Sequence, residues 1–203
     1  MRRHLVVMVK EPRPGRVKTR LGQEIGPVPA AWWMRHQTAR LLRRLRDPRW
    51  TLWLAVAPDT AVASRIWPAD LPRIAQGRGD LGDRMGRILR GAPDCAPLPS
   101  RGPLCIVGSD IPGLGRSQVA RAFALLGGHD AVFGPATDGG YWLVGLKRLG
   151  PPPPVLFRGV RWSSPWTLAD SVATLPGLRV AHADTLSDVD TAADLAHPGR
   201  PVS

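Results

Sequence analysis

A short stretch near the start of the chain combines positive charge with a stiff, glycine-containing backbone. Its five cations, set against one acid within eleven residues, are Lys10, Arg13, Arg16, Lys18 and Arg20. Pro14 stiffens the middle of this first loop, and Gly15 permits backbone geometry that other residues avoid. Cations and backbone N–H groups at such a loop favour binding of phosphate groups. We therefore interpret the loop as a cradle for a nucleotide's phosphates; the alternative is an ordinary solvated basic loop.

Carboxylates follow several of the expected strands. Asp110 comes directly after an apolar run, Asp138 lies in an Asp-Gly-Gly turn, and Asp188 and Asp190 form an Asp-x-Asp pair near the end. Mg²⁺ and Mn²⁺ take hard oxygen ligands of this kind together with substrate phosphates. Acidic metal ligands that face a basic loop suit phosphate or pyrophosphate chemistry. We expect a divalent cation at these carboxylates.

A glycine-rich turn precedes an expected helix at residues 81–90. It contains Gly79, Asp80 and Gly82. A turn of this composition could hold a base, a sugar or a phosphate, and it could equally be a connector. The Asp-Gly-Gly segment after Thr137 is open to two interpretations as well, a hairpin turn or a part of a substrate site.

The elements that must position these residues alternate along the chain. Buried apolar runs predict strands at residues 5–9, 50–57, 103–108, 130–135 and 178–183, with a further strand after the turn at 138–140. Helical periodicity and helix-ending residues predict helices at 30–46, 61–67, 81–90, 118–126 and 164–175, and a short one that begins at Asp190 or Thr191. This alternation predicts an α/β fold with a mostly parallel sheet flanked by helices. We expect a single domain over residues 1–203, with a core at about 4–196 and a tail at 197–203.

Composition limits which kinds of molecule the protein is expected to bind and where it is expected to act. The formal charge of +12 could favour nucleic acid, but 25 of the 28 cations are arginines scattered along the chain, so we expect no specific nucleic-acid binding. No apolar run approaches the roughly 18 residues of a membrane span. The apolar stretch after the basic N-terminus is too short for a signal peptide, and the two cysteines match no metal or redox spacing. We expect a cytoplasmic protein; the sequence leaves the oligomeric state open.

Taken together, these motifs resemble one family in their order along the chain. The matching segments are Lys10 to Leu21, Gly79 to Met85, Gly108 to Leu114, Gly134 to Leu146 and Asp188 to Leu195. The chain is similar to an uncharacterised bacterial and archaeal group with the nucleotide-diphospho-sugar transferase (GT-A) fold, some members of which are linked to arsenosugar biosynthesis. The most specific motif is Lys-x-Pro-x-Pro-Gly-x-Val-Lys-Thr-Arg-Leu. More distantly, the chain resembles 2-phospho-lactate guanylyltransferase and the molybdenum-cofactor nucleotidyltransferases.

The resemblance implies a Rossmann-like sheet that binds a nucleotide at the carboxyl ends of its first strands. It assigns Lys18 and Arg20 to the phosphates, Asp110 to the metal, and Asp188 or Asp190 to a late acidic position that completes the metal site. Asp138 is the candidate base that activates an acceptor hydroxyl. The expected nucleotide- and substrate-binding residues are Lys10, Pro14, Gly15, Gly79, Asp80, Gly82, Ser109, Gly139, Gly140 and Tyr141.

The chain departs from a typical glycosyltransferase because no Asp-x-Asp follows the third expected strand, where Ser109-Asp110 supplies one carboxylate. Three functions therefore compete. The first is metal-dependent transfer of a sugar from a nucleoside-diphosphate sugar to a small acceptor. The second is nucleotidyl transfer from a nucleoside triphosphate to a small phosphorylated substrate. The basic first loop resembles that of nucleotidyltransferases more closely than that of glycosyltransferases. The third is a non-catalytic module that binds nucleotides or nucleic acid.

Overall fold

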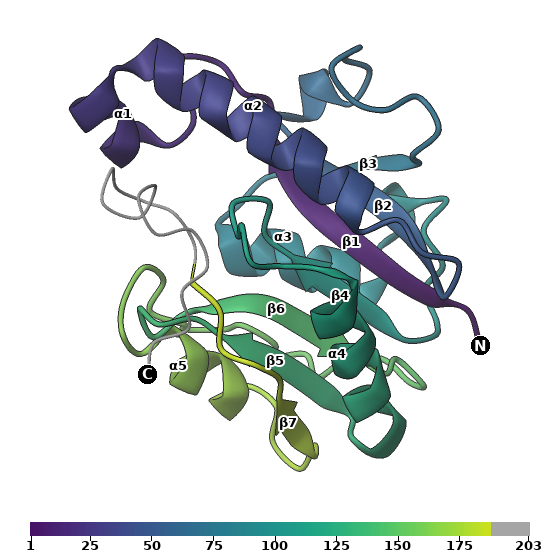
Figure 1. Ribbon diagram of the computed structural model, residues 1–203. Coiled ribbons are helices and arrows are strands. Elements are labelled where there is room, and N and C mark those ends of the chain that lie inside the picture. The colour runs from purple at the N-terminus through teal and green to yellow at the C-terminus, as the bar shows by residue number, and fades with distance from the viewer. Residues whose placement is uncertain (188–203) are drawn as a thin grey trace.

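The computed structural model describes residues 1–187, which form a seven-stranded sheet with helices on both faces (Figure 1). The strands are β1 (Arg3–Lys10), β2 (Trp50–Ala57), β3 (Arg73–Ala75), β4 (Leu104–Val107), β5 (Ala131–Pro135), β6 (Tyr141–Leu146) and β7 (Val180–His182). The helices are α1 (Thr19–Ile25), α2 (Pro27–Arg44), α3 (Leu81–Arg90), α4 (Arg116–Gly128) and α5 (Thr167–Ala173). Short 3-10 turns occupy Asp59–Ala61 and Pro93–Cys95.

The sheet has the order β3-β2-β1-β4-β6-β5-β7. Strand β6 runs antiparallel to both of its neighbours, and the other pairs are parallel. The predicted α/β fold with a mostly parallel sheet is confirmed. Strands β2 and β3 lie on one side of β1, and β4 lies on the other side. The strand order therefore reverses between β1 and β4, and ligands of open α/β sheets bind at such a point.

Side chains of β1 alternate between two cores because successive residues of a strand point to opposite faces. Val7 belongs to the core that α2 and α4 cover, where Leu41 and Phe123 pack. Val6 belongs to the opposite core, where Ile88 of α3 packs. Figure 1 shows α2 running across β1. Residues on both faces are sealed from water, so the central strands read as continuous apolar runs in the sequence.

Two local predictions differ from the structure. The expected helix at 61–67 is absent: the 3-10 turn at Asp59–Ala61 leads into turns instead. The side chain of Arg73 donates to carbonyl oxygens of this segment, among them those of Val62 and Trp67, so an arginine satisfies backbone groups of a segment that forms no helix. Arg73 also opens β3, a strand of three residues that the sequence analysis missed beside the glycine-rich turn.

Helix α2 begins three residues earlier than expected, at Pro27. Proline suits the first turn of a helix because the N–H group that it lacks has no partner there. The expected helix that begins at Asp190 or Thr191, and the tail, lie outside the described residues. Within residues 1–187, no helix is long and apolar enough to cross a membrane.

Candidate functional site

The first loop and the loop after β4 meet at the carboxyl edge of the sheet. Strands β1 and β4 pair in parallel, with Val7 opposite Val107, so both chains leave the sheet at the same edge. One loop carries Lys18 and the other carries Ser109 and Asp110. This edge is the point at which the strand order reverses.

An ion pair joins the two loops. The Lys18 Nζ atom lies 2.6 Å from Asp110 Oδ2, and the exposed fractions of the two side chains are 8% and 30%. Lys18 has left-handed backbone geometry, with φ 46° and ψ 51°, and it directly precedes α1. A non-glycine residue in this region carries strain that the surrounding structure must stabilise, and such residues cluster at functional sites. The structure therefore brings together two residues that the sequence places 92 positions apart.

Lys18 and Arg20, which the resemblance assigns to the phosphates, lie differently relative to this site. Lys18 directly precedes α1, and Arg20 lies in the first turn of that helix, which begins at Thr19. Arg20 lies exposed in the first turn of α1 and outside the cavity that Lys18 lines. Pro14 and Gly15 are also exposed and lie outside that cavity. Their roles in binding a phosphate stay predictions.

A cavity of about 480 Å³, hereafter the basic cavity, opens beside the ion pair. Its charged and polar lining residues are Lys10, Arg16, Lys18, Thr19, Gln76, Ser109 and Asp110. Apolar side chains complete its wall, among them those of Met8, Met34, Leu81 and Met85. Three cations and a single carboxylate make this a site for an anion with an apolar part. Lys10, Lys18 and Ser109, which the sequence predicts to bind the nucleotide or its phosphates, all line this cavity.

A second cavity, of about 320 Å³, adjoins the first and is hereafter the acidic cavity. Its carboxylates come from Asp80, Asp110 and Asp138, and its aromatic walls come from Tyr141, Trp142 and Trp162. None of the described residues that line it is a lysine or an arginine. Carboxylates accept hydrogen bonds from hydroxyl or ammonium groups, and aromatic faces pack on apolar or cationic ones. The cavity therefore suits a ligand without negative charge.

The two cavities have a common wall. The residues that line both are Leu81, Gly108, Asp110, Tyr141 and Trp142. Asp110 is the charged member of this wall, and its Oδ2 atom already faces Lys18. A ligand in the basic cavity and a ligand in the acidic cavity would therefore meet at Asp110.

The glycine-rich turn shapes α3. The Asp80 side chain accepts a hydrogen bond of 2.9 Å from the Asp83 backbone, and the Asp83 side chain accepts one of 3.1 Å from the Asp80 backbone. This reciprocal cap begins α3. A Cβ atom at Gly82 would lie 2.6 Å from the Trp162 ring, so glycine lets Trp162 pack against the helix. Gly79 and Gly82 line neither cavity, whereas Asp80 lines the acidic one.

The Asp-Gly-Gly turn forms another part of the acidic cavity. Asp138 Oδ1 accepts a hydrogen bond of 2.9 Å from the Gly140 N–H group. Gly139 has a φ of +86°, and a Cβ atom there would lie 2.4 Å from the Pro165 carbonyl oxygen. The Gly139 carbonyl accepts a hydrogen bond of 3.0 Å from Leu168. The turn is therefore docked against the start of α5, and glycine is required at its centre.

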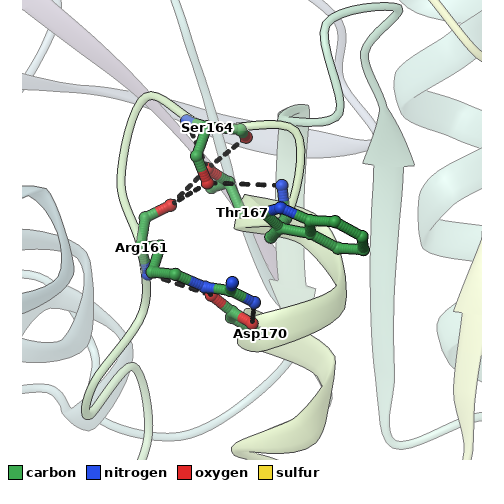
Figure 2. Close-up of polar contacts among 5 residues, drawn as sticks. Arg161, Ser164, Thr167 and Asp170 are labelled. Carbon is green, nitrogen blue, oxygen red and sulfur yellow. Dashed lines mark hydrogen bonds and ion pairs between the residues drawn. The ribbon is translucent and has the colours of Figure 1, made fainter.

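A network of hydrogen bonds holds the loop that carries Trp162 and Ser163. Figure 2 shows the Arg161 guanidinium group facing both oxygens of Asp170, at 2.8 Å each. The Ser164 hydroxyl donates to the Arg161 carbonyl oxygen at 2.7 Å, and the Thr167 hydroxyl lies 2.8 Å from the same oxygen. The hydrogen bonds from Arg161 lower the pKa of Asp170 to about 2. No local sequence pattern predicts this network, because its members meet only once the loop folds back onto α5.

Tyr141 is fixed from two sides at the common wall. Its ring packs edge-on against Phe133 at 4.9 Å between centroids, and its hydroxyl lies 3.3 Å from the Ser171 hydroxyl. Burial is the main cause that raises the pKa of the Tyr141 phenol, so the phenol is a hydrogen-bonding group rather than a base at neutral pH. Trp142 donates its indole N–H to the Asp184 carbonyl oxygen at 2.8 Å.

A divalent cation would find Asp110 as its carboxylate at the junction. Within residues 1–187, no group of three or more His, Cys, Asp or Glu side chains could hold a metal ion. Mg²⁺ is usually bound through one or two carboxylates, with substrate phosphates and waters as the other ligands. Asp110 fits that limited role, and the other expected ligands, Asp188 and Asp190, lie outside the described residues.

The fold and the paired cavities define a class of protein, an α/β domain of the nucleotide-diphospho-sugar transferase fold. A protein of Desulfovibrio desulfuricans G20, proposed to be a nucleotide-diphospho-sugar transferase, is 30% identical; the alignment covers 94% of this chain and 84% of that one, with a TM-score of 0.75. Residues 39–164 match a family described as "Uncharacterized protein conserved in bacteria (DUF2064)", and the chain belongs to that family. The predicted resemblance to an uncharacterised GT-A-like family is confirmed.

More distant structures share the fold alone. The 4-diphosphocytidyl-2C-methyl-D-erythritol synthase of Anaerococcus prevotii DSM 20548 is 8% identical, with 97% of this chain and 96% of that one covered and a TM-score of 0.55. Rv0371c of Mycobacterium tuberculosis H37Rv, in complex with manganese, is 13% identical, with full coverage of both chains and a TM-score of 0.52. A comparison with curated proteins gives no match.

Proposed function

We propose that the protein transfers a sugar from a nucleoside-diphosphate sugar to a small, uncharged acceptor that carries a hydroxyl group. The observation that carries this proposal is the division of charge across the common wall: the basic cavity contains three cations, and the acidic cavity contains carboxylates and aromatic rings. The nucleoside diphosphate would occupy the first and the acceptor the second, with the sugar between them at Asp110.

On the donor side, the reaction develops negative charge on the departing diphosphate. Lys18 is a compact cation at the junction, with its ammonium group already positioned by Asp110 at 2.6 Å. Lys10 and Arg16 line the same cavity. Cations fixed where charge develops stabilise a transition state more than flexible ones do, because they need no reorganisation. Arg20, in the first turn of α1, is a further candidate for the phosphates.

On the acceptor side, the reaction needs a group that takes a proton from a hydroxyl. Asp138 Oδ1 is occupied by the Gly140 N–H group, which holds the carboxylate in place and leaves Oδ2 for the acceptor. We assign Asp138 as the general base in this proposal. Asp80 lines the same cavity and begins α3 through its cap, and we assign it to bind the acceptor.

We include Mg²⁺ or Mn²⁺ in the proposal, held by Asp110 with the diphosphate and, outside the described residues, by Asp188 or Asp190. When bound, such an ion neutralises charge on the diphosphate. Lys18 would keep its contact with Asp110 as the nucleotide enters, because an ammonium group has three donors and the remaining ones can face the phosphate oxygens. Ser109, buried in the wall of the basic cavity, would contact the diphosphate through its hydroxyl.

Nucleotidyl transfer is the second candidate, and the basic first loop is the observation that favours it. In that reaction a phosphate group of the second substrate attacks the nucleoside triphosphate. The acidic cavity argues against it, since three carboxylates with no lysine or arginine among the described lining residues would repel a phosphorylated substrate.

A product assay tests the choice. The protein is incubated with Mn²⁺, a set of small sugars and polyols, and either nucleoside-diphosphate sugars or nucleoside triphosphates with sugar phosphates. We expect release of a nucleoside diphosphate with the first donors and no pyrophosphate with the second. Pyrophosphate that depends on a phosphorylated acceptor would overturn the proposal in favour of nucleotidyl transfer, and no product from either set would favour a non-catalytic module.

A further inference from the structure

Gln76 lies in the basic cavity and is almost completely buried, with 5% of its surface exposed. It directly follows β3, and its backbone N–H continues the pairing with β2 by donating to the Val56 carbonyl at 3.0 Å. Its side chain reaches back across the ends of the neighbouring strands. The amide nitrogen, Nε2, donates to the Val9 carbonyl at 3.0 Å and to the Ala55 carbonyl at 2.9 Å.

These two contacts fix the orientation of the amide. An amide nitrogen has two N–H donors, and both point to backbone oxygens that can only accept. The reverse orientation would set the amide oxygen against two carbonyl oxygens, which is repulsive. Gln76 therefore presents Oε1 as a pure acceptor whose direction is set by the sheet.

Within residues 1–187, Oε1 has no hydrogen-bond partner, and it is not among the polar atoms sealed from solvent without one. It is therefore accessible from the cavity. Once a ligand fills the cavity and excludes water, an amide oxygen that stays unpaired costs free energy, so a ligand that supplies a donor gains affinity at this point. A ligand that supplies an acceptor or a methyl group instead is penalised.

The surroundings of Gln76 suit a flat ring. Met8, Leu81 and Met85 line the same cavity, and Met8 and Met85 belong to the apolar side of the sheet that α3 covers. Methionine packs well against aromatic rings because its side chain is flexible and its sulfur is polarisable. The cations of the cavity serve the phosphates, so the apolar side chains with one fixed acceptor are left for the base.

We infer that Gln76 determines the choice of nucleobase: Oε1 accepts a hydrogen bond from an N–H group on the Watson–Crick edge of the base. This inference rests on the proposed nucleotide site and adds to it the residue that distinguishes one base from another. Because the amide is held by two backbone carbonyls, it cannot turn to offer its N–H groups instead.

The experiment measures binding of UDP, GDP, CDP and ADP to the full chain by calorimetry in Mn²⁺. The preferred nucleotide is then compared with its analogue in which the Watson–Crick N–H groups carry methyl groups. We expect the analogue to bind the parent protein at least about 10-fold more weakly, the effect of about 1.4 kcal/mol. In Gln76→Met the dissociation constants of the two nucleotides should differ by less than about 3-fold, because the hydrogen bond that distinguishes them is absent.

Two further variants separate recognition from folding. Gln76→Lys keeps a donor for the Val9 and Ala55 carbonyls but removes the acceptor, and it should also lose the discrimination. Gln37→Met is the matched control, because Gln37 is an equally buried glutamine of α2 that lines neither the basic nor the acidic cavity. It should discriminate as the parent protein does.

The inference is overturned if the methylated analogue binds the parent protein as tightly as the natural nucleotide, or if the Gln76 variants still discriminate. Either result would leave sugar transfer, measured separately by release of the nucleoside diphosphate, unaffected. If no nucleoside diphosphate binds the parent protein at all, the proposed function and this inference both fail.

Discussion

The basic and acidic cavities share a wall, yet different parts of the chain give them their character. The basic cavity takes its charge from the first loop, which is anchored at its ends by the Glu11 N–H bond to the Ala57 carbonyl and by the Lys18–Asp110 pair. The stretch between these anchors, from residue 13 to residue 16, is exposed.

The acidic cavity takes its shape from two turns that are cross-linked by side chains. The Arg161–Asp170 pair, the Ser164 and Thr167 hydroxyl groups, and the docked turn at Gly139 hold its wall. The charges of the basic cavity therefore lie on a partly exposed loop, whereas the wall of the acidic cavity is cross-linked. Substitutions in the two cavities should therefore have different signatures.

Asp110 faces both cavities, so its loss should have the largest effect. We expect Asp110→Asn to lower kcat/KM about 10³-fold, the upper range for loss of a group that stabilises developing charge. The stabilisation by nucleotide with Mn²⁺, about 2.7 kcal/mol at a hundred times the dissociation constant, should also disappear. Thermal unfolding with and without both ligands measures this, and an unchanged metal-dependent shift would remove Asp110 from the metal site.

Substitution of two glycines with positive φ, one beside each cavity, tests how rigid the two cavities are. Gly139→Ala combines an unfavourable φ with a Cβ atom 2.4 Å from the Pro165 carbonyl oxygen, whereas a Cβ atom at Gly15 would meet nothing within 4 Å. We expect a loss in the free energy of unfolding of about 3 kcal/mol for Gly139→Ala. For Gly15→Ala we expect about 1 kcal/mol. Urea denaturation gives both values; equal losses would show that the turn at Gly139 can move away from Pro165.

Lys18 tests the donor side. We expect Lys18→Ala to lower kcat about 10²-fold, because the charge acts on the departing diphosphate. Arg20→Ala should have a smaller effect, since Arg20 lies outside the lining of the basic cavity. Arg43→Ala, exposed on α2, is the control and should match the parent protein. If the three variants turn over alike, the basic cavity does not bind the phosphates.

Asp138 tests the acceptor side. Asn keeps an oxygen for the Gly140 N–H group, so Asp138→Asn should preserve the turn while removing the base. We expect kcat to fall about 10²-fold, as on loss of a general base, with an unchanged dissociation constant for the nucleoside diphosphate. Steady-state kinetics and calorimetry measure the two quantities. A weaker nucleotide affinity with unchanged kcat would place Asp138 on the donor side.

The smallest effect concerns pH and the Arg161–Asp170 pair. Since the pKa of Asp170 is lowered to about 2 from an ordinary value of about 3.9, the pair stabilises the folded state above about pH 4 and loses that effect as the pH falls toward 2. The difference in Tm between the parent protein and Arg161→Ala should therefore be present at pH 5 and vanish near pH 2.

Arg49→Ala provides a matched control for that measurement. Arg49 binds Asp47 with the same two-pronged geometry, at 2.8 Å for both contacts, and lowers the pKa of Asp47 to about 2. We expect the same dependence of Tm on pH in both variants. A rise in KM for the acceptor should occur in Arg161→Ala alone, because only Arg161 holds the loop that carries Trp162. Equal KM values in the two variants would mean that the network does not shape the acceptor site.

Several features of the fold follow from the sequence by itself. Apolar runs long enough for buried strands locate β1, β2, β4, β5, β6 and β7, and periodicity locates α3 and most of α2 and α4. The first loop and Asp110 stand out because each directly follows such a run. Burial on both faces of a sheet leaves a continuous apolar run, and a loop that leaves the sheet has to be polar, so both signals are local.

Tertiary structure alone decided which residues meet. Nothing in the sequence sets β4 beside β1, and that pairing brings Lys18 within 2.6 Å of Asp110. The sequence does not single out Gln76, because its orientation depends on two carbonyls of other strands. It does not single out Trp162 either, because that ring packs against Gly82 of a helix far away in the sequence. Local patterns report whether a residue is buried and in which element it lies. The order of strands in the sheet depends on the packing of the whole chain, and it determines which charges share a cavity.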